Sequence, residues 1–278
     1  MEKIGIIGNG FVGNSIAFGF SPTHEIRIHD KDPKRNLHTI EEVLECDFVF
    51  VAVPTPMNQK GAISLDVVIK ALGEIYDKNK RTDNVIILKS TMIPGTTNLL
   101  VEQFPRLNIV FNPEFLTERT AKLDFLTQAR IILGGDKKYT AKVKELFEDR
   151  FVHCYVIEMD TITAEMIKYM NNVFFATKVS IMNEFKLVCN AIGGDWDQAL
   201  KGFAADQRIG DSHLNVPGPD GKLGFGGSCF PKDINAFMSM AKDLEIDIPT
   251  VEGAWKTNLN VRPEEDWKLL KGRAVVDK

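Results

Sequence analysis

A G-x-G-x-x-G pattern near the start of the chain is formed by Gly8, Gly10 and Gly13. The apolar run Ile4–Ile7 before it suits a buried strand, and Asn14–Phe20 after it has helical character. In this context the glycines permit a tight turn and let backbone N–H groups approach a pyrophosphate at the amino end of a helix. The pattern therefore predicts a Rossmann-type domain that binds a dinucleotide, with Phe11 and Val12 inside the binding turn.

The acidic residue that this motif requires follows at the end of a second apolar segment, Glu25–His29, where the chain has Asp30. A carboxylate at this place binds the ribose hydroxyls of the adenosine, which favours NAD over NADP. Arg35 is close in sequence and could accept a 2′-phosphate, but Asp30 would repel that phosphate. We therefore expect NAD as the cofactor, with both residues near the adenosine.

Apolar strands alternate with helical segments through the first half of the chain. The expected strands are residues 4–7, 25–29, 47–53, 84–88, 108–111, 129–134 and 154–157. Strands separated by helices predict a parallel, doubly wound sheet whose ligands bind beyond the carboxyl ends of the strands. Thr55, Thr91 and residues 112–118 fall in such loops. We assign residues 1–158 to this α/β domain.

The second half of the chain changes character. Residues 161–192 read as one helix without proline, too long for an ordinary crossover helix, and residues 206–227 form a long loop rich in Gly and Pro. A further helix is expected to begin near Asp233, with Pro231 just before it, and another at Pro249. We therefore expect residues 159–278 to form an all-helical domain, in which the long helix offers an apolar face to a second subunit.

Composition excludes several classes of partner. A formal net charge of −4 gives no basic surface for nucleic acid. No apolar run approaches the roughly 20 residues that span a bilayer, and no signal peptide is expected ahead of Ile4. The cysteines are Cys46, Cys154, Cys189 and Cys229, without the spacing of disulfide or metal sites. We expect reduced thiols, no bound metal and a cytoplasmic protein.

The segment GFGGSCFPKD, residues 224–233, contains the parts of a covalent catalytic site. Cys229 follows a flexible Gly-Gly pair that includes Gly226, and it precedes the cation Lys232 and the carboxylate Asp233. A thiolate is the reactive form of cysteine, and a neighbouring cation favours it. The alternative interpretation is a buried structural cysteine beside a tight turn.

Together these segments resemble the UDP-glucose/GDP-mannose dehydrogenases. The motifs that carry the resemblance occur in the family's order: GNGFVG at 8–13, VPTP at 53–56, ST at 90–91, NPEFLTE at 112–118, Lys168 with Asn172, NE at 183–184, RIG at 208–210 and GFGGSCFPKD at 224–233. The resemblance covers residues 3 to 260, and the cysteine and NPEFL motifs are specific. Members of the family oxidise the C6 alcohol of a nucleotide sugar to a carboxylate and use two NAD molecules per turnover, with UDP-glucose the first candidate substrate here.

The resemblance also implies a role for each catalytic residue. Cys229 would attack the C6 aldehyde, hydride transfer would convert the thiohemiacetal to a thioester, and Asp233 with a water would act as general base. Lys168 would stabilise oxyanion character at C6. Glu118 would serve thioester hydrolysis. The remaining two catalytic positions would order the attacking water, and they are Thr91 and Asn172.

Two further groups of positions follow from the resemblance. Cofactor contacts beyond the glycine turn and its acid are expected at Thr55, Thr91, Glu118 and Lys232. Substrate contacts are expected at Glu114, Phe115, Leu116, Lys168, Asn172, Arg208, His213 and Gly226. Arg208 is also a candidate to reach across a homodimer. Family members continue into a second Rossmann-like domain that binds the nucleotide, so the resemblance implies a short form or a fragment.

Physical reasoning on single residues leaves alternatives. Lys168 and Asn172 lie four residues apart on a predicted helix and so share a face suited to an oxyanion, yet a solvated helix lysine has the same signature. Glu114 could cap a helix, and the loop threonines could satisfy backbone groups. Two rival functions also remain, a two-electron hydroxyacid-type NAD dehydrogenase and a nucleotide-binding or sensing protein that has lost turnover.

Overall fold

The computed structural model describes residues 2–276, which divide into two compact units. The first unit is built from the residues up to Thr55 and from Leu65–Lys168. The second is built from Pro56–Ser64 and from the residues that begin at Tyr169. Among residues 2–276, no helix is long and apolar enough to cross a membrane, and no three His, Cys, Asp or Glu side chains cluster as metal ligands would.

The first unit contains a seven-stranded sheet in the order β2-β1-β3-β4-β5-β6-β7. The strands are β1 (Lys3–Ile7), β2 (Glu25–His29), β3 (Phe48–Val51), β4 (Val85–Leu88), β5 (Asn108–Phe111), β6 (Arg130–Gly135) and β7 (Tyr155–Met159). Strands β1 to β5 are parallel, as the sequence predicts. Strand β6 pairs antiparallel with β5, and β7 runs parallel to β6, so the expectation of an all-parallel sheet is wrong for these two strands.

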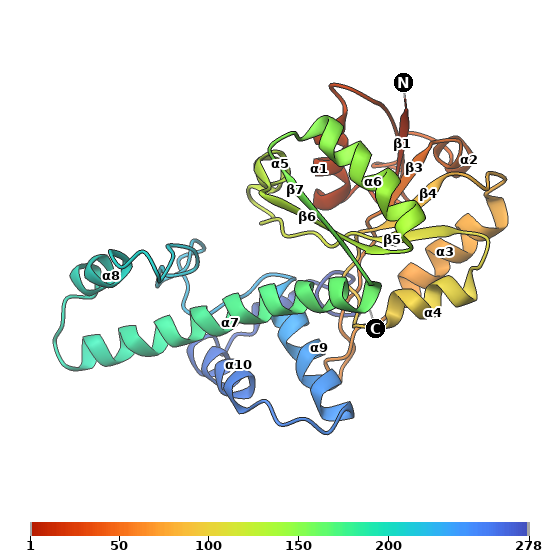
Figure 1. The fold of residues 1–278 in the computed structure, drawn as a ribbon. Helices are drawn as coiled ribbons and strands as arrows, with labels where there is room; N and C mark the ends of the chain where they lie inside the picture. Colours follow the sequence, from red (N-terminus) through yellow and green to blue (C-terminus); the bar gives the residue numbers. More distant parts are fainter. Residues whose placement is uncertain (1, 277–278) are drawn as a thin grey trace. The chain divides into compact units, whose positions relative to one another are not determined.

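Helices cover both faces of this sheet (Figure 1). They are α1 (Phe11–Phe20), α2 (Ile40–Leu44), α3 (Asp66–Lys78), α4 (Thr96–Gln103), α5 (Ala121–Thr127) and α6 (Lys137–Arg150). Alternate residues of β3 enter opposite layers: Phe48 and Phe50 pack with α1, α5 and α6, whereas Val49 and Val51 pack with α2, α3 and α4. A strand buried on both faces needs an unbroken apolar run, which is why the central strands carry no polar alternation. The doubly wound prediction is confirmed.

The second unit is helical. Its elements are α7 (Thr161–Ala191), whose first two turns belong to the first unit, α8 (Trp196–Ala204), α9 (Phe230–Asp243), α10 (Pro249–Val261) and the 3₁₀ turn η1 (Asp266–Leu269). Helix α7 packs against α9 and α10 through a small core that includes Ala176, Ile234 and Ala254 (Figure 1). Helix α9 begins at Phe230, earlier than expected, because a proline in the first turn lacks only an N–H that the helix does not use.

A short excursion from the first half of the chain completes the second unit. The backbone N–H of Met57 donates to the Ala274 carbonyl at 2.9 Å, and the Val276 N–H donates to the Met57 carbonyl at 2.9 Å. Met57 also packs against Trp267, which is 1% exposed. Residues 56–64 are therefore held by a segment that lies more than two hundred positions later in the sequence.

Candidate functional site

The three glycines of the amino-terminal motif differ in the space that surrounds each Cα atom. Gly8 has φ +99°, and a Cβ built on it would lie 2.5 Å from the Ala52 carbonyl oxygen. A Cβ on Gly13 would overlap the Gly8 carbonyl, so this glycine permits helix α1 to pack on the turn. Gly10 has open space where its Cβ would be. The turn thus has an accessible backbone at its centre, where a pyrophosphate could approach.

The surroundings of this turn fit a dinucleotide. Helix α1 begins without a side-chain cap and without an acid in its first turn, and the amino end of a helix favours an anion such as a phosphate. The Asp30 carboxylate accepts the Asn9 N–H at 2.6 Å, which fixes it beside the glycines. The buried Oδ1 of Asn9 has no hydrogen-bond partner among residues 2–276. The Arg35 guanidinium is exposed and lies 3.6 Å from Asp32 rather than at Asp30.

The two predicted threonines follow the carboxyl ends of neighbouring strands. Thr55 follows β3 and is 4% exposed, and Thr91 follows β4 and is 8% exposed. Between them, the Ser90 hydroxyl donates to the Val53 carbonyl at 2.7 Å, which ties the two loops together. The structure therefore places both threonines at the edge of the sheet where ligands of doubly wound folds bind.

Lys168 and Glu114 form a buried ion pair. The Lys168 ammonium donates to the Glu114 carbonyl oxygen at 2.5 Å and to its Oε1 at 3.0 Å. The other carboxylate oxygen accepts the Leu116 N–H at 2.8 Å. Phe115 packs under the same ammonium, 5.5 Å from its ring centre. Lys168 is 2% exposed, so it is not a solvated helix lysine, and the Glu114 motif positions a desolvated cation.

Sequence reasoning missed Lys89, which directly follows β4. Its ammonium donates to Asn112 Oδ1 at 2.8 Å and lies 3.4 Å from the Pro113 carbonyl oxygen. Burial lowers the pKa of Lys89 to about 7, and the nearby Lys168 charge acts in the same direction while Glu114 opposes it. A lysine at the end of an otherwise apolar strand is the signal that could have identified it, because such a strand end leads into the ligand edge.

Stability should depend on pH through Lys89. Between pH 7 and about 10.5, the unfolded chain holds more protons at this amine than the folded protein, so the free energy of unfolding should rise with pH across this range. Below pH 7 the amine is protonated in both states, and the cost of burying the charge is fully present. Urea unfolding at several pH values should therefore show that the free energy of unfolding rises more steeply with pH for wild type than for Lys89→Met. The exposed Lys34→Met serves as the control, and a parallel rise in wild type and Lys89→Met would contradict the assignment.

Within the second unit, the structure brings four predicted residues together at the start of α9. Cys229 is the N-cap residue of this helix and is half-buried. Asp233 lies one turn later, is fully buried, and pairs with Lys232. The Asn172 amide donates to the other oxygen of Asp233 at 2.5 Å. The amino end of a helix favours a negative charge, so it suits a thiolate at Cys229.

His213 also lies near this cysteine. Its ring stacks on Phe175 with 4.2 Å between centroids and approaches Phe230, the residue after Cys229, at 5.4 Å. Burial, followed by the charge of Lys178, lowers the pKa of His213, which favours its neutral form. His213 has φ +62°, an uncommon backbone conformation for this residue. The ring of His213 is therefore held among aromatic side chains.

Two predicted residues are exposed. The Arg208 side chain is 89% exposed and pairs with Asp206 at 2.6 Å. Glu118 is exposed on the loop that follows the buried Glu114. The NPEFLTE motif therefore places its first glutamate inside the first unit and its second at the surface.

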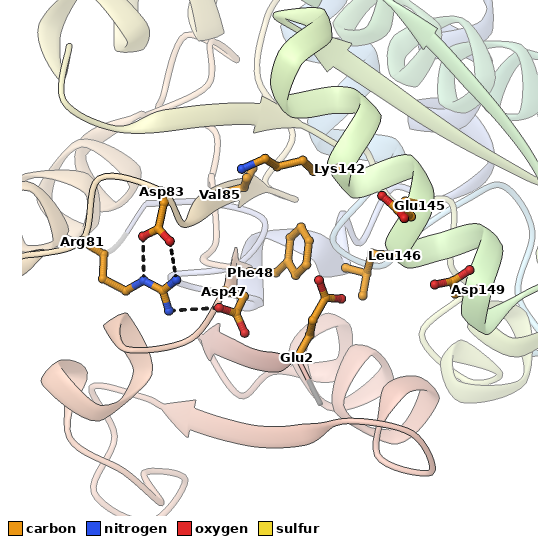
Figure 2. Close-up of a pocket in the computed structure, with 10 residues that line it drawn as sticks. All are labelled: Glu2, Asp47, Phe48, Arg81, Asp83, Val85, Lys142, Glu145, Leu146 and Asp149. Atoms are coloured by element: carbon orange, nitrogen blue, oxygen red, sulfur yellow. Dashed lines mark hydrogen bonds and ion pairs between the residues drawn. The ribbon is translucent and has the colours of Figure 1, made fainter.

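A cavity of about 500 Å³ lies at the opposite edge of the sheet, where strands β3 and β4 begin (Figure 2). It is lined by Glu2, Asp47, Phe48, Arg81, Asp83, Val85, Lys142, Glu145, Leu146 and Asp149. Figure 2 shows Arg81 paired with Asp83 and Asp47, and the lining has five carboxylates against two cations. An acidic cavity at the amino ends of the strands is unsuited to an anionic dinucleotide, so we assign no cofactor to it.

Comparison with known proteins agrees with the division of the chain into a sheet-containing unit and a helical unit. Residues 34–151 match the NAD-binding domain of the UDP-glucose/GDP-mannose dehydrogenase family, and residues 162–260 match its central domain. The chain belongs to this family. Its sheet-containing unit corresponds to the family's NAD-binding domain, and its helical unit corresponds to the family's central domain.

Individual members of the family are similar to this chain in sequence and in structure. A UDP-glucose 6-dehydrogenase of Bacillus subtilis is 34% identical over 87% of this chain, and one of Haloferax volcanii is 31% identical over 99%. The chain spans 57% of the length of the first and 73% of the second. The structure of a UDP-glucose dehydrogenase from Pyrobaculum islandicum is similar with a TM-score of 0.83 at 27% identity, over 94% of this chain and 68% of that one.

Proposed function

We propose that this chain catalyses the NAD-dependent, four-electron oxidation of a nucleotide-sugar C6 alcohol to a carboxylate, with UDP-glucose as the first candidate substrate. The observation that carries the proposal is the arrangement at the start of α9. Cys229 occupies the amino end of the helix, and the buried Asp233 one turn later is held by Asn172 and Lys232. Membership in the family and the fit of the glycine turn to a dinucleotide support the same reaction.

The first oxidation removes a proton and a hydride from the C6 alcohol and leaves an aldehyde. In this proposal Asp233, acting through a water, takes the hydroxyl proton, because it is the carboxylate that follows Cys229 by one turn of α9. The glycine turn and Asp30 would hold the dinucleotide, which would supply the acceptor for the hydride of each oxidation. The aldehyde must be retained for a second oxidation, and a covalent bond to the enzyme does this.

The second oxidation proceeds on Cys229. The thiolate adds to the aldehyde carbon, a C–S bond forms and the carbonyl oxygen takes up the negative charge. Loss of the second hydride from this thiohemiacetal anion gives the thioester. Water then adds to the thioester carbon, and the C–S bond breaks to release the carboxylate and regenerate the thiol. The overall change consumes one water and two oxidised dinucleotides.

The other predicted residues act on charge and water. Lys168 stabilises the negative charge that develops on the C6 oxygen, since a desolvated ammonium acts more strongly than one in water. Thr91 and Asn172 order the attacking water, and Glu118 assists thioester hydrolysis. Glu114, Phe115, Leu116, His213, Arg208 and Gly226 contact the sugar nucleotide, and Thr55, Arg35 and Lys232 contact the cofactor in this proposal.

Counting NADH against sugar tests the proposal. Purified protein is supplied with NAD and, in turn, UDP-glucose, UDP-linked amino sugars and GDP-mannose, and the absorbance of NADH is compared with the sugar consumed. Two NADH per sugar with an acidic product supports the proposal. One NADH per sugar indicates a two-electron dehydrogenase, and NAD binding without any NADH indicates a sensing or binding protein. Either result would overturn it.

We also propose that the chain forms a homodimer through α7. In the second unit, this helix exposes apolar side chains that lie three, four or seven residues apart along one face, and they are Met170, Phe174, Ile181, Phe185 and Val188. Phe174 is 63% exposed and Val188 is 61% exposed. A row of large apolar side chains along one helix is the pattern by which two helices pack together. A second copy of the chain offers a matching row.

Charged substitutions on this row should separate the subunits. Phe174→Glu combined with Val188→Glu should halve the mass measured by light scattering, because a carboxylate buried at a helix–helix interface has no partner there. Asn190→Glu, at an exposed polar position of α7, should leave the mass unchanged. A wild type that is already monomeric, or a dimer that survives both charges, would disprove the assignment.

A further inference from the structure

The loop before Cys229 lacks the backbone pairing that holds most buried segments. Residues 223–228, the pre-cysteine loop, are in neither helix nor strand, yet Gly224 and Phe225 are buried. Buried backbone N–H and C=O groups require partners. Those partners are side chains from α7, from α10 and from Arg262, the residue that follows α10.

Two buried asparagines satisfy the backbone of this loop. Asn258 Oδ1 accepts the Phe225 N–H at 2.7 Å, and its Nδ2 donates to the Phe225 carbonyl at 3.1 Å. Asn183 Oδ1 accepts the Gly224 N–H at 3.0 Å. The side chains are 0% and 2% exposed, so these bonds form away from competing water. One asparagine thus replaces a strand partner for both polar groups of Phe225.

Arg262 holds the outer side of the same loop. It is 3% exposed, and its Nη2 donates to Asp220 at 2.7 Å and to Asp266 at 2.6 Å. Its Nε donates to the other oxygen of Asp266 at 3.0 Å, and its Nη1 lies 3.4 Å from the Leu223 carbonyl oxygen. Two carboxylates and a carbonyl thus compensate the burial of one guanidinium.

Two glycines of the loop, Gly224 and Gly226, are explained by these contacts. A Cβ on Gly226 would overlap Arg262 Nη2 and would lie 2.6 Å from its Cζ. A Cβ on Gly224 would overlap Asn258 Oδ1, and Gly224 has φ +65°. The guanidinium therefore packs directly on the backbone of Gly226, three residues before Cys229. This gives Gly226 a physical role other than contact with a substrate.

We propose that Asn183, Asn258 and Arg262, the loop clamp, are positioning residues that hold the pre-cysteine loop so that the Cys229 sulfur stays at the amino end of α9. The inference rests on the proposed function, in which Cys229 is the nucleophile. None of the three residues needs to touch the substrate. Their effect is to keep the thiol where the helix favours its thiolate form and where Asp233 is one turn away.

A double-mutant cycle tests the clamp. Arg262→Met and Gly226→Ala are made singly and together, and the rate at which iodoacetamide labels Cys229 is measured by peptide mass spectrometry relative to Cys189 in the same molecules. Each single variant should lower the ratio about threefold, because the loosened loop moves the sulfur from the helix terminus. The double variant should have the same labelling ratio as either single variant, because both substitutions disrupt the same contact. Arg262→Lys should recover part of the ratio, and Arg27→Met, which removes an ion-paired arginine of the first unit, should not change it.

Asn258→Asp provides a second test should Arg262→Met fail to fold. It keeps the acceptor for the Phe225 N–H and loses the donor to the Phe225 carbonyl, so it should lower the ratio and raise hydrogen exchange at Gly224 and Phe225. An unchanged ratio in these variants would overturn the clamp. The clamp would also be overturned if the double variant lowered the ratio by the product of the two single effects, because Gly226 and Arg262 would then act independently. The labelling ratio needs no turnover, so a wild type that fails to oxidise any nucleotide sugar refutes the proposed function without deciding the clamp.

Discussion

Cys229→Ser should stop the reaction before the carboxylate forms. A serine hydroxyl is not ionised near neutral pH and is a far weaker nucleophile than a thiolate, so carboxylate formation should fall by about a thousandfold or more. NADH production should stop at or before the first equivalent per sugar. The measurement is the stoichiometry of NADH against nucleotide sugar, with the product analysed for aldehyde and acid.

Cys189→Ser is the matched control. This cysteine is also half-buried and belongs to the second unit, so its replacement tests the loss of a thiol without touching the start of α9. We expect the control to keep both the rate and two NADH per sugar. A Cys229→Ser protein that still yields two NADH per sugar at a rate close to wild type would exclude the covalent route.

Asp233→Asn should lower the rate by about a hundredfold to ten-thousandfold, the range that removal of a general base produces. Asparagine keeps the shape of the side chain and its bond to Asn172 through one oxygen, but it cannot accept a proton. The change also leaves the Lys232 ammonium buried without its carboxylate, and breaking a buried pair costs about 3–5 kcal/mol of stability.

Activity and stability must therefore be measured on the same preparation. Urea unfolding establishes the folded fraction, and kcat is then corrected for it. Asp243→Asn, on the exposed last turn of the same helix, should change neither quantity. If the folded Asp233→Asn protein works within tenfold of wild type, another group takes the proton.

Local patterns predicted the sheet well, because each buried strand is a short apolar run between turn residues. The direction of β6 was not predictable in this way. A run such as 129–134 has the same composition whether it runs parallel or antiparallel to its neighbour, and direction is decided by the path of the chain between the strands. The early start of α9 likewise depends on proline being acceptable in a first turn.

Site residues that are close in sequence were the easiest to predict. Cys229 and Asp233 are four positions apart, and a helix brings them together without further information. Lys89 and Arg262 escaped notice because a buried cation looks like any surface cation in a sequence. Lys89 is buried against Asn112, which lies 23 residues away in the sequence, and Arg262 is buried against Asp220, which lies 42 residues away. No local rule predicts such pairs.

Because residue 57 pairs with residues 274 and 276, the second unit should complete its folding after the first during synthesis. On the ribosome, the excursion at 56–64 emerges long before its partners, so the second unit cannot close until the chain has been made through residue 276. The sheet of the first unit needs nothing beyond residue 168 and is free to form earlier. By the same reasoning, expressing residues 169–276 alone would leave the Met57 position beside Trp267 unfilled.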